Sequence, residues 1–140
     1  MSDEDIRRIL TQTKRIALVG ASAKPERASY EVMRFLLENG FDVTPVNPGL
    51  AGQEILGRKV VATLAEATPL DMVDLFRRAE DVDAPVEEAI RLGAKTVWMQ
   101  LGVVNEAAAA KARAAGLAVV MDRCPAIEMP RLDRSRQAPN

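Results

Sequence analysis

The sequence contains no histidine and a single cysteine, Cys124. The lack of histidine excludes the Ser-His and Cys-His nucleophile pairs, phosphohistidine chemistry and most zinc or iron sites. One cysteine cannot form an internal disulfide, which fits a reducing compartment. Because so few of the usual catalytic groups remain, the composition predicts a protein that is not an enzyme on its own.

Long apolar runs and an excess of charge of either sign are also absent. No stretch approaches the about 20 uncharged residues that a membrane-spanning helix needs, and the acidic residues 3–5 are unlike the start of a secretory signal. A formal net charge of −1 gives no basic face for nucleic acid. We expect a cytoplasmic protein with no membrane or nucleic-acid partner, while a protein partner stays open.

What the chain does contain is a regular alternation of short apolar runs and amphipathic segments. Strands are predicted at 15–20, 41–46, 72–76, 96–100 and 117–121, and helices at 3–13, 27–39, 85–93 and 105–115. Residues 50–60 read as irregular, and 64–67 as a short helical turn. The pattern predicts an α/β fold: a single Rossmann-like domain with a mostly parallel five-stranded sheet and helices on both faces.

Two details refine this prediction. Pro45 within the second strand is tolerable if that strand lies near an edge of the sheet. After Pro130 the chain is polar, so we expect the domain to cover residues 1–130 and a disordered tail to cover 131–140.

The first strand ends in a glycine turn, Gly20-Ala21-Ser22, that precedes a helix. In such folds a glycine there lets the backbone approach a ligand, and the helix start directs free N–H groups toward a phosphate. Lys24 and Arg27 carry charges that would neutralise that phosphate. A tight connection with exposed basic residues explains the same segment equally well, so the turn alone leaves both interpretations open.

The turn departs from the dinucleotide fingerprint G-x-G-x-x-G, because Ser22 and Pro25 occupy the second and third glycine positions. The acidic residue that holds the ribose hydroxyls of NAD is expected at the end of the second strand. Val46-Asn47-Pro48 stands there instead. The sequence therefore disfavours ordinary NAD binding.

Five motifs in order make the chain similar to a known family. They are VGAS at 19–22, PVNP at 45–48, DMVDLFRR at 71–78, VWMQLGV at 97–103 and DRCP at 122–125. Together they resemble the stand-alone bacterial CoA-binding domain proteins, which are similar to the N-terminal domain of the succinyl-CoA synthetase α subunit. The resemblance runs from about Ile6 to Ala126, which is nearly the whole chain.

The resemblance implies coenzyme A as the cofactor, lying across the carboxyl edge of the sheet. It implies that Gly20, Ala21 and Ser22 hold phosphate with Lys24 and Arg27 nearby, and that Val46, Asn47 and Pro48 flank the adenosine. It also implies that Phe76 and Arg77 line the exit of the third strand. An acidic residue in place of Asn47 would repel the 3′-phosphate of CoA, so its absence agrees with this ligand.

Several residues keep two interpretations. Gln100 and Gly102 face the ligand if the resemblance holds, whereas Asn105 and Trp98 are most simply a helix cap and core packing. Phe76 is either a ligand contact or core. Cys124 either forms a mixed disulfide with the thiol of CoA or is a small semi-buried residue. Asp122 and Arg123 form an ion pair or cap a loop, and no chemistry is assigned to them.

Three functions follow from these observations. The first is a non-catalytic protein that binds CoA or acyl-CoA and acts as carrier, sensor or partner module. The second is a Rossmann module for another adenine nucleotide, NADP or ADP. The third is a subunit of an acyl-CoA ligase whose catalytic domain is on another chain, since the synthetase's phosphorylated histidine has no counterpart here.

Overall fold

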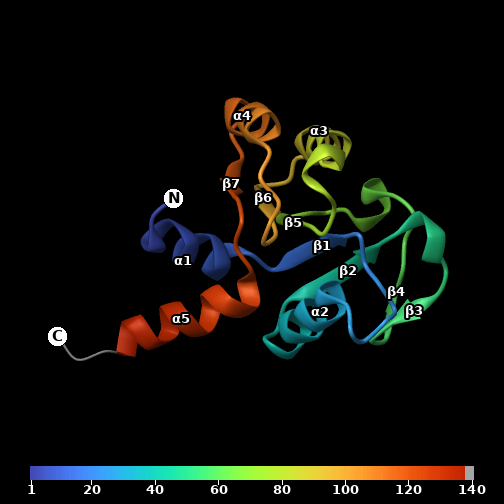
Figure 1. Cartoon of the computed structure of the whole chain (residues 1–140). Helices are drawn as coiled ribbons and strands as arrows, with labels where there is room; N and C mark the ends of the chain where they lie inside the picture. Colours follow the sequence, from blue (N-terminus) through green and yellow to red (C-terminus); the bar gives the residue numbers. More distant parts are fainter. Residues whose placement is uncertain (138–140) are drawn as a thin grey trace.

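The computed structural model, which describes residues 1–137, contains a five-stranded sheet in the order β2-β1-β5-β6-β7 (Figure 1). Its strands are β1 Arg15–Val19, β2 Asp42–Val46, β5 Met72–Leu75, β6 Thr96–Met99 and β7 Ala118–Val120. Every pairing in it is parallel. The predicted α/β class and five-stranded sheet are confirmed, and Pro45 lies in the edge strand β2 as expected.

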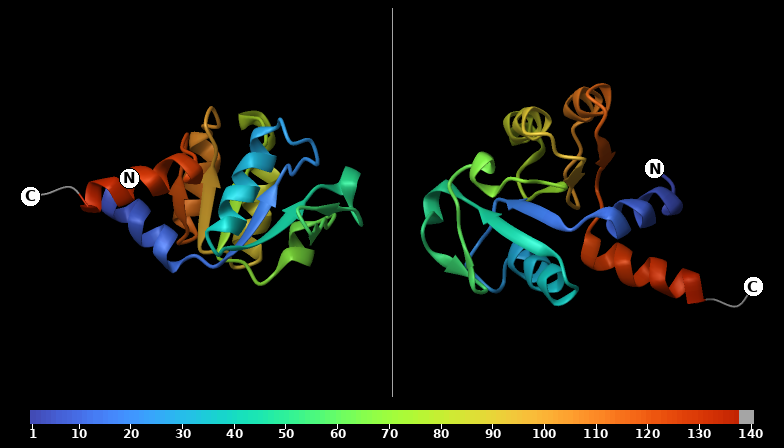
Figure 2. Two further views of the ribbon diagram at one scale, coloured as in Figure 1. Left: turned by 90° about the horizontal axis from the view of Figure 1, so that it is seen from below. Right: turned by 180° about the vertical axis from the view of Figure 1, so that it is seen from behind.

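Five helices cover the two faces of this sheet. They are α1 Asp3–Gln12, α2 Ala28–Glu38, α3 Asp83–Arg91, α4 Glu106–Ala114 and α5 Pro125–Gln137. Helices α3 and α4 lie on one face, and α1, α2 and α5 on the other (Figures 1 and 2). Short 3-10 turns at Pro48–Leu50 (η1), Leu64–Ala67 (η2) and Ala79–Asp81 (η3) complete the connections. No helix among the described residues is long and apolar enough to span a membrane.

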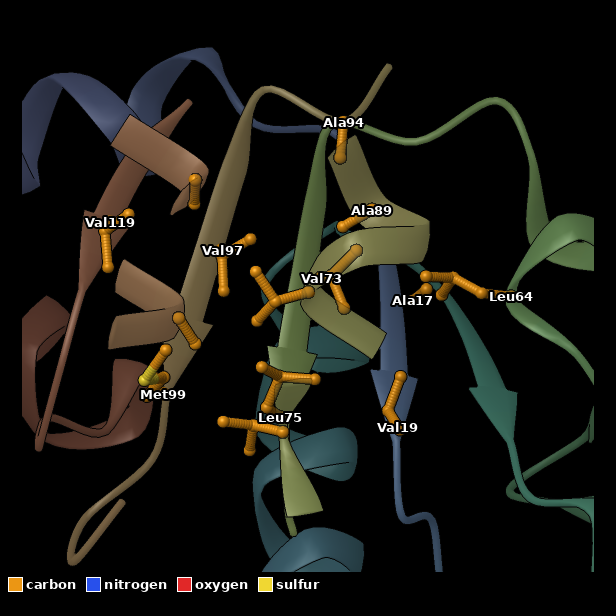
Figure 3. Close-up of a cluster of buried hydrophobic side chains, with 14 of the residues drawn as sticks. Ala17, Val19, Leu64, Val73, Leu75, Ala89, Ala94, Val97, Met99 and Val119 are labelled. Atoms are coloured by element: carbon orange, nitrogen blue, oxygen red, sulfur yellow. The ribbon is translucent and has the colours of Figure 1, made fainter. Parts of the chain in front are cut away.

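Alternate residues along each central strand enter different cores, because successive side chains of a strand point to opposite faces. Figure 3 shows the core under α3 and α4, where Val73 and Leu75 of β5 meet Val97 and Met99 of β6. The opposite core contains Trp98, which is fully buried and donates from Nε1 to the Arg123 carbonyl at 2.7 Å. Trp98 therefore packs in the core, as predicted.

The boundaries of several helices follow from local capping. Ser2 and Asp5 form a capping box at the start of α1. The Asn105 side chain accepts from the backbone N–H of Ala108, so Asn105 is the cap of α4.

Helix α5 is a feature that the sequence prediction missed. It continues through Pro130 to Gln137, so residues 131–137 are helical where the sequence predicts a disordered tail; residues 138–140 lie outside the described part of the chain. Pro130 and the polar residues after it gave the false signal. The helix is held by Leu132, which is buried against α1, and by ion pairs of Arg131 with Asp3 and Glu128.

The segment 50–60 also differs from its prediction. It contains a small antiparallel hairpin of β3 Glu54–Ile55 and β4 Arg58–Lys59. The two turn residues, Leu56 and Gly57, both have positive φ, which is the conformation of a tight two-residue hairpin turn. Leu56 is a poor match to that conformation, which is why no hairpin is predicted from the sequence here.

Candidate functional site

The candidate site lies where the strand order reverses, between the carboxyl ends of β1 and β5. The chain passes from β1 to β2 through α2 on one face, and from β5 to β6 through α3 on the other. Such a switch point leaves a crevice in which α/β proteins bind ligands. The loops that follow β1 and β6 emerge at the same edge of the sheet (Figure 2).

Gly20 allows the backbone at the end of β1 to lie very close to the backbone at the end of β5. Its φ is +88°, and a Cβ atom at this position would overlap the carbonyl oxygen of Phe76. The Gly20 N–H donates to the Val46 carbonyl at 3.0 Å, and the Phe76 N–H donates to the Val19 carbonyl at 2.8 Å. The ends of β1, β2 and β5 are thus fastened together at one point, and no other residue type fits at 20 without displacing backbone.

A cavity of about 520 Å³, here called the α2 cavity, opens beside this point at the start of α2. Seven of the twelve predicted site residues line it: Gly20, Ala21, Ser22, Lys24, Arg27, Asn47 and Phe76. The prediction had not included four others: Ala28, Ser29, Gly49 and Leu50. Ala28 and Ser29 could have been found from the predicted helix start.

The α2 cavity is suited to an anion. The backbone N–H groups of Ala28 and Ser29 begin α2 and have no acceptor among the described residues. These groups carry the positive end of the helix dipole. Neither Lys24 nor Arg27 forms an ion pair with a described residue. The positive end of the helix dipole and the side-chain charges of Lys24 and Arg27 therefore both face the α2 cavity.

Asn47 has a structural role at the rim of this cavity. Its Nδ2 donates to the Ala21 carbonyl at 2.8 Å, and its Oδ1 accepts from the Gly49 N–H at 2.9 Å. The side chain thus joins the exits of β1 and β2. An aspartate could accept from Gly49 but could not donate to Ala21.

A second cavity of about 390 Å³, the α3 cavity, lies on the other side of the β1 end. Three more predicted residues, Val46, Pro48 and Arg77, line it. Asp81 and Glu88 also line it, so the charge of Arg77 is opposed there by two carboxylates. This cavity is less suited to phosphate than the α2 cavity, and better suited to an uncharged group with N–H donors.

The last two predicted residues, Gln100 and Gly102, line neither cavity. Gln100 is 5% exposed, and its Nε2 donates to Asp74 Oδ1 at 2.8 Å. The Gly102 N–H donates to Asp122 Oδ1 at 2.7 Å, so Asp122 caps the loop after β6 and is not paired with Arg123. Arg123 instead pairs with Glu128 of α5.

Asp74 is a buried acid that the sequence interpretation overlooked. It lies in the middle of β5, is fully buried, and its Oδ2 has no hydrogen-bond partner. Burial raises the pKa of Asp74 to about 7, while the hydrogen bond from Gln100 lowers it by less. The available signal was a single charged residue within the otherwise apolar run 72–76. No group of three or more metal-ligating side chains occurs among the residues that the structure describes.

Cys124 lies just before α5 and is 7% exposed. Burial raises the pKa of its thiol, which disfavours the reactive thiolate. We expect iodoacetamide at pH 7.5 to label the native protein at least about tenfold more slowly than the urea-unfolded protein. Intact-protein mass spectrometry over time measures both rates. Equal rates would contradict this expectation and would reopen a mixed disulfide with the thiol of a ligand.

Comparisons with known proteins agree with this geometry. Residues 14–130 match the protein family described as CoA binding domain. The chain is 40% identical over 124 residues to YneT of Bacillus subtilis, covering 88% of this chain and 90% of YneT. A solved structure of a Pyrococcus horikoshii OT3 protein has a TM-score of 0.89 at 48% identity, covering 94% of this chain and 92% of that one.

A larger relative shares only part of its length with this chain. The α subunit of acetate–CoA ligase [ADP-forming] I from Pyrococcus furiosus is 34% identical over 93 residues. The matched region is 63% of this chain but 20% of that subunit. The family match spans most of the chain, and its range of residues 14–130 includes every residue that lines the α2 and α3 cavities. The chain belongs to the CoA binding domain family.

Proposed function

We propose that this protein binds CoA or acyl-CoA non-covalently at the carboxyl edge of the sheet and has no catalytic activity of its own. The observation that carries this proposal is the α2 cavity, where Lys24, Arg27 and the start of α2 converge without an acidic partner. CoA carries three phosphate groups, so its binding site has to supply positive charge and N–H donors. In this function the protein acts as a carrier, a sensor or a module of a larger assembly.

The distribution of charge orients the ligand. The diphosphate lies in the α2 cavity against the N–H groups of Ala28 and Ser29, since helix starts favour anions. The adenine base reaches past Asn47 into the α3 cavity, where Val46 and Pro48 offer apolar surface, while the ribose 3′-phosphate stays on the α2-cavity side, away from the carboxylates of Asp81 and Glu88. The pantetheine arm then leaves past Phe76 toward the ends of β6 and β7.

The absence of a catalytic mechanism is part of the proposal. Ser22, the hydroxyl beside the cavity, has no histidine to activate it, and its Oγ accepts from the Lys24 N–H at 3.1 Å. Asp74 is enclosed in the core and lines neither cavity. A partner chain would have to supply any reaction of the thioester.

A thermal-shift panel with CoA, acetyl-CoA, NAD, NADP and ADP tests the ligand class. A ligand at 100 times its dissociation constant stabilises the native state by about 2.7 kcal/mol. That corresponds to a rise in melting temperature of several degrees for a domain of this size. We expect the rise with CoA and acetyl-CoA. A rise with NAD or NADP and none with CoA would contradict the proposal and favour another nucleotide.

Removing the charges tests the placement of the phosphates. We expect Arg27→Ala to weaken CoA binding about tenfold, and Lys24→Ala with Arg27→Ala to weaken it about 30- to 100-fold, because charge-assisted hydrogen bonds to phosphate are lost. Isothermal titration calorimetry measures the affinities. Arg34→Ala is the matched control, since Arg34 is an exposed arginine of the same helix that does not line the cavity. If the double variant bound CoA like the Arg34 variant, the phosphates would lie elsewhere.

A further inference from the structure

Exposed apolar side chains occur in the two segments that follow the carboxyl ends of β6 and β7. Four large apolar side chains are about half exposed among the described residues, and the three besides Met1 are Leu101, Val104 and Ile127. Leu101 and Val104 lie in the loop between β6 and α4, and Ile127 lies in the first turn of α5. We call these three residues the edge patch.

The backbone around the edge patch is fixed in place. The bond from the Gly102 N–H to Asp122 Oδ1 joins the loop after β6 to the segment after β7, and the Val103 N–H donates to the Gln100 carbonyl at 2.9 Å. Asp122 has a φ of +58°, which is costly for a residue with a side chain. The loop after β6 and the start of α5 are close in both views of Figure 2 and in Figure 1.

The edge patch continues the proposed CoA site along the sheet. Neighbouring strands lie about 4.8 Å apart, so the ends of β6 and β7 are about 10 and 14 Å from the end of β1, which holds the phosphates. Phe76 and then Gln100 stand along this path.

We infer that the edge patch holds the acyl group of a bound acyl-CoA, and that the preferred ligand is a thioester of a short, uncharged, apolar acid. This inference rests on the proposed function. Three half-exposed side chains are too small for a specific protein interface, which buries about 800 Å² on each partner, but they match one short acyl chain. The exposed carboxylate of Asp122 beside Leu101 disfavours an acyl group with a second carboxylate, such as succinyl.

Calorimetry with CoA, butyryl-CoA and succinyl-CoA tests this inference. We expect butyryl-CoA to bind about fivefold more tightly than CoA, because its methylene groups are partly covered. Succinyl-CoA should bind no more tightly than CoA. In the Leu101→Ser, Ile127→Ser double variant the preference for butyryl-CoA should disappear while the affinity for CoA stays unchanged. Ala110→Ser, an exposed change on α4, is the control and should keep the preference.

The outcomes separate this inference from the proposed function. If CoA bound and butyryl-CoA bound equally well, the edge patch would not hold the acyl group, but CoA binding would stand. If none of the three ligands bound, the proposed function itself would fail. Size-exclusion chromatography adds a further test. If the native protein is a dimer and the double variant is a monomer, the inference is overturned, and the edge patch is a contact between two copies.

Discussion

Replacing Gly20 with alanine is expected to destabilise the protein by about 3–5 kcal/mol and to abolish CoA binding. The residue has a φ of +88°, and a methyl group there would overlap the Phe76 carbonyl oxygen and lie 3.0 Å from the Phe76 carbonyl carbon. Neither atom belongs to a flexible side chain, so β1 and β5 would have to separate at their ends. A loss of this size is a large share of the about 5–15 kcal/mol that stabilises a typical domain.

Gly40→Ala is the matched control for this experiment. Gly40 also has a φ of +88°, but an added methyl group would meet nothing within 4 Å. The control should cost only about 1–2 kcal/mol, the strain of the backbone conformation alone. Urea unfolding followed by the fluorescence of Trp98, which is fully buried, measures both variants. Equal losses at the two positions would show that Gly20 and Phe76 do not need their close approach.

The second large effect is expected from replacing Asp74, which should change the free energy of unfolding by an amount that depends on pH. The pKa of Asp74 is raised to about 7 in the folded protein, whereas an unfolded aspartate titrates near its ordinary value of about 3.9. Between these pH values the folded state holds a proton that the unfolded state has released. The stability from this group is therefore fully present below about pH 4 and is lost as the pH rises through about 7.

Asp74→Asn should therefore stabilise the protein at pH 8 by about 2–4 kcal/mol and change little at pH 4. Asparagine resembles the protonated acid: its oxygen can accept from Gln100, and its amide replaces the hydroxyl at the unpartnered Oδ2 position. Urea unfolding of the native sequence and the variant at several pH values gives the difference in the free energy of unfolding. A difference that does not change with pH would mean that Asp74 titrates normally.

Asp71→Asn supplies a control of opposite sign. Partial burial raises the pKa of Asp71, but hydrogen bonds from the N–H groups of Arg15 and Lys14, with Lys95 nearby, lower it by more. Its contribution is present above the ordinary pKa of about 3.9 and is lost as the pH falls through the lower folded value. Asp71→Asn should therefore destabilise the protein at neutral pH, where Asp74→Asn stabilises it.

The sequence predicts the sheet and its glycine turn well because both depend on local patterns. The apolar runs before Gly20 and Pro48 mark two strands, and the amphipathic pattern that ends at Gly93 marks a helix, without reference to distant residues. Seven of the predicted site residues meet in one cavity because the carboxyl ends of parallel strands share an edge. The proposed ligand rests on the resemblance to the CoA-binding domain proteins, because the residues alone leave the ligand open.

What the sequence could not predict depends on contacts between distant segments. Helix α5 contains Pro130 and is held by Asp3, more than 120 residues earlier in the chain, so no local window favours it. The acidic lining of the α3 cavity comes from Asp81 of η3 and Glu88 of α3, which only the folded arrangement brings beside the ends of β1 and β2. The buried state of Asp74 likewise depends on distant segments, since its partners on the neighbouring strands are the fully buried Leu18 of β1 and Trp98 of β6.

The edge strand β2 has one more consequence, for the behaviour of the protein at high concentration. Pro45 has no N–H to offer to another chain, and the residues that follow are already engaged, since Val61 donates to the Pro45 carbonyl and Asn47 donates to the Val61 carbonyl. The opposite edge, β7, is only three residues long. Both edges thus resist the strand addition that seeds aggregates. If copies of this protein associate, they do so through helices and loops, and no strand of a second copy is added to the sheet.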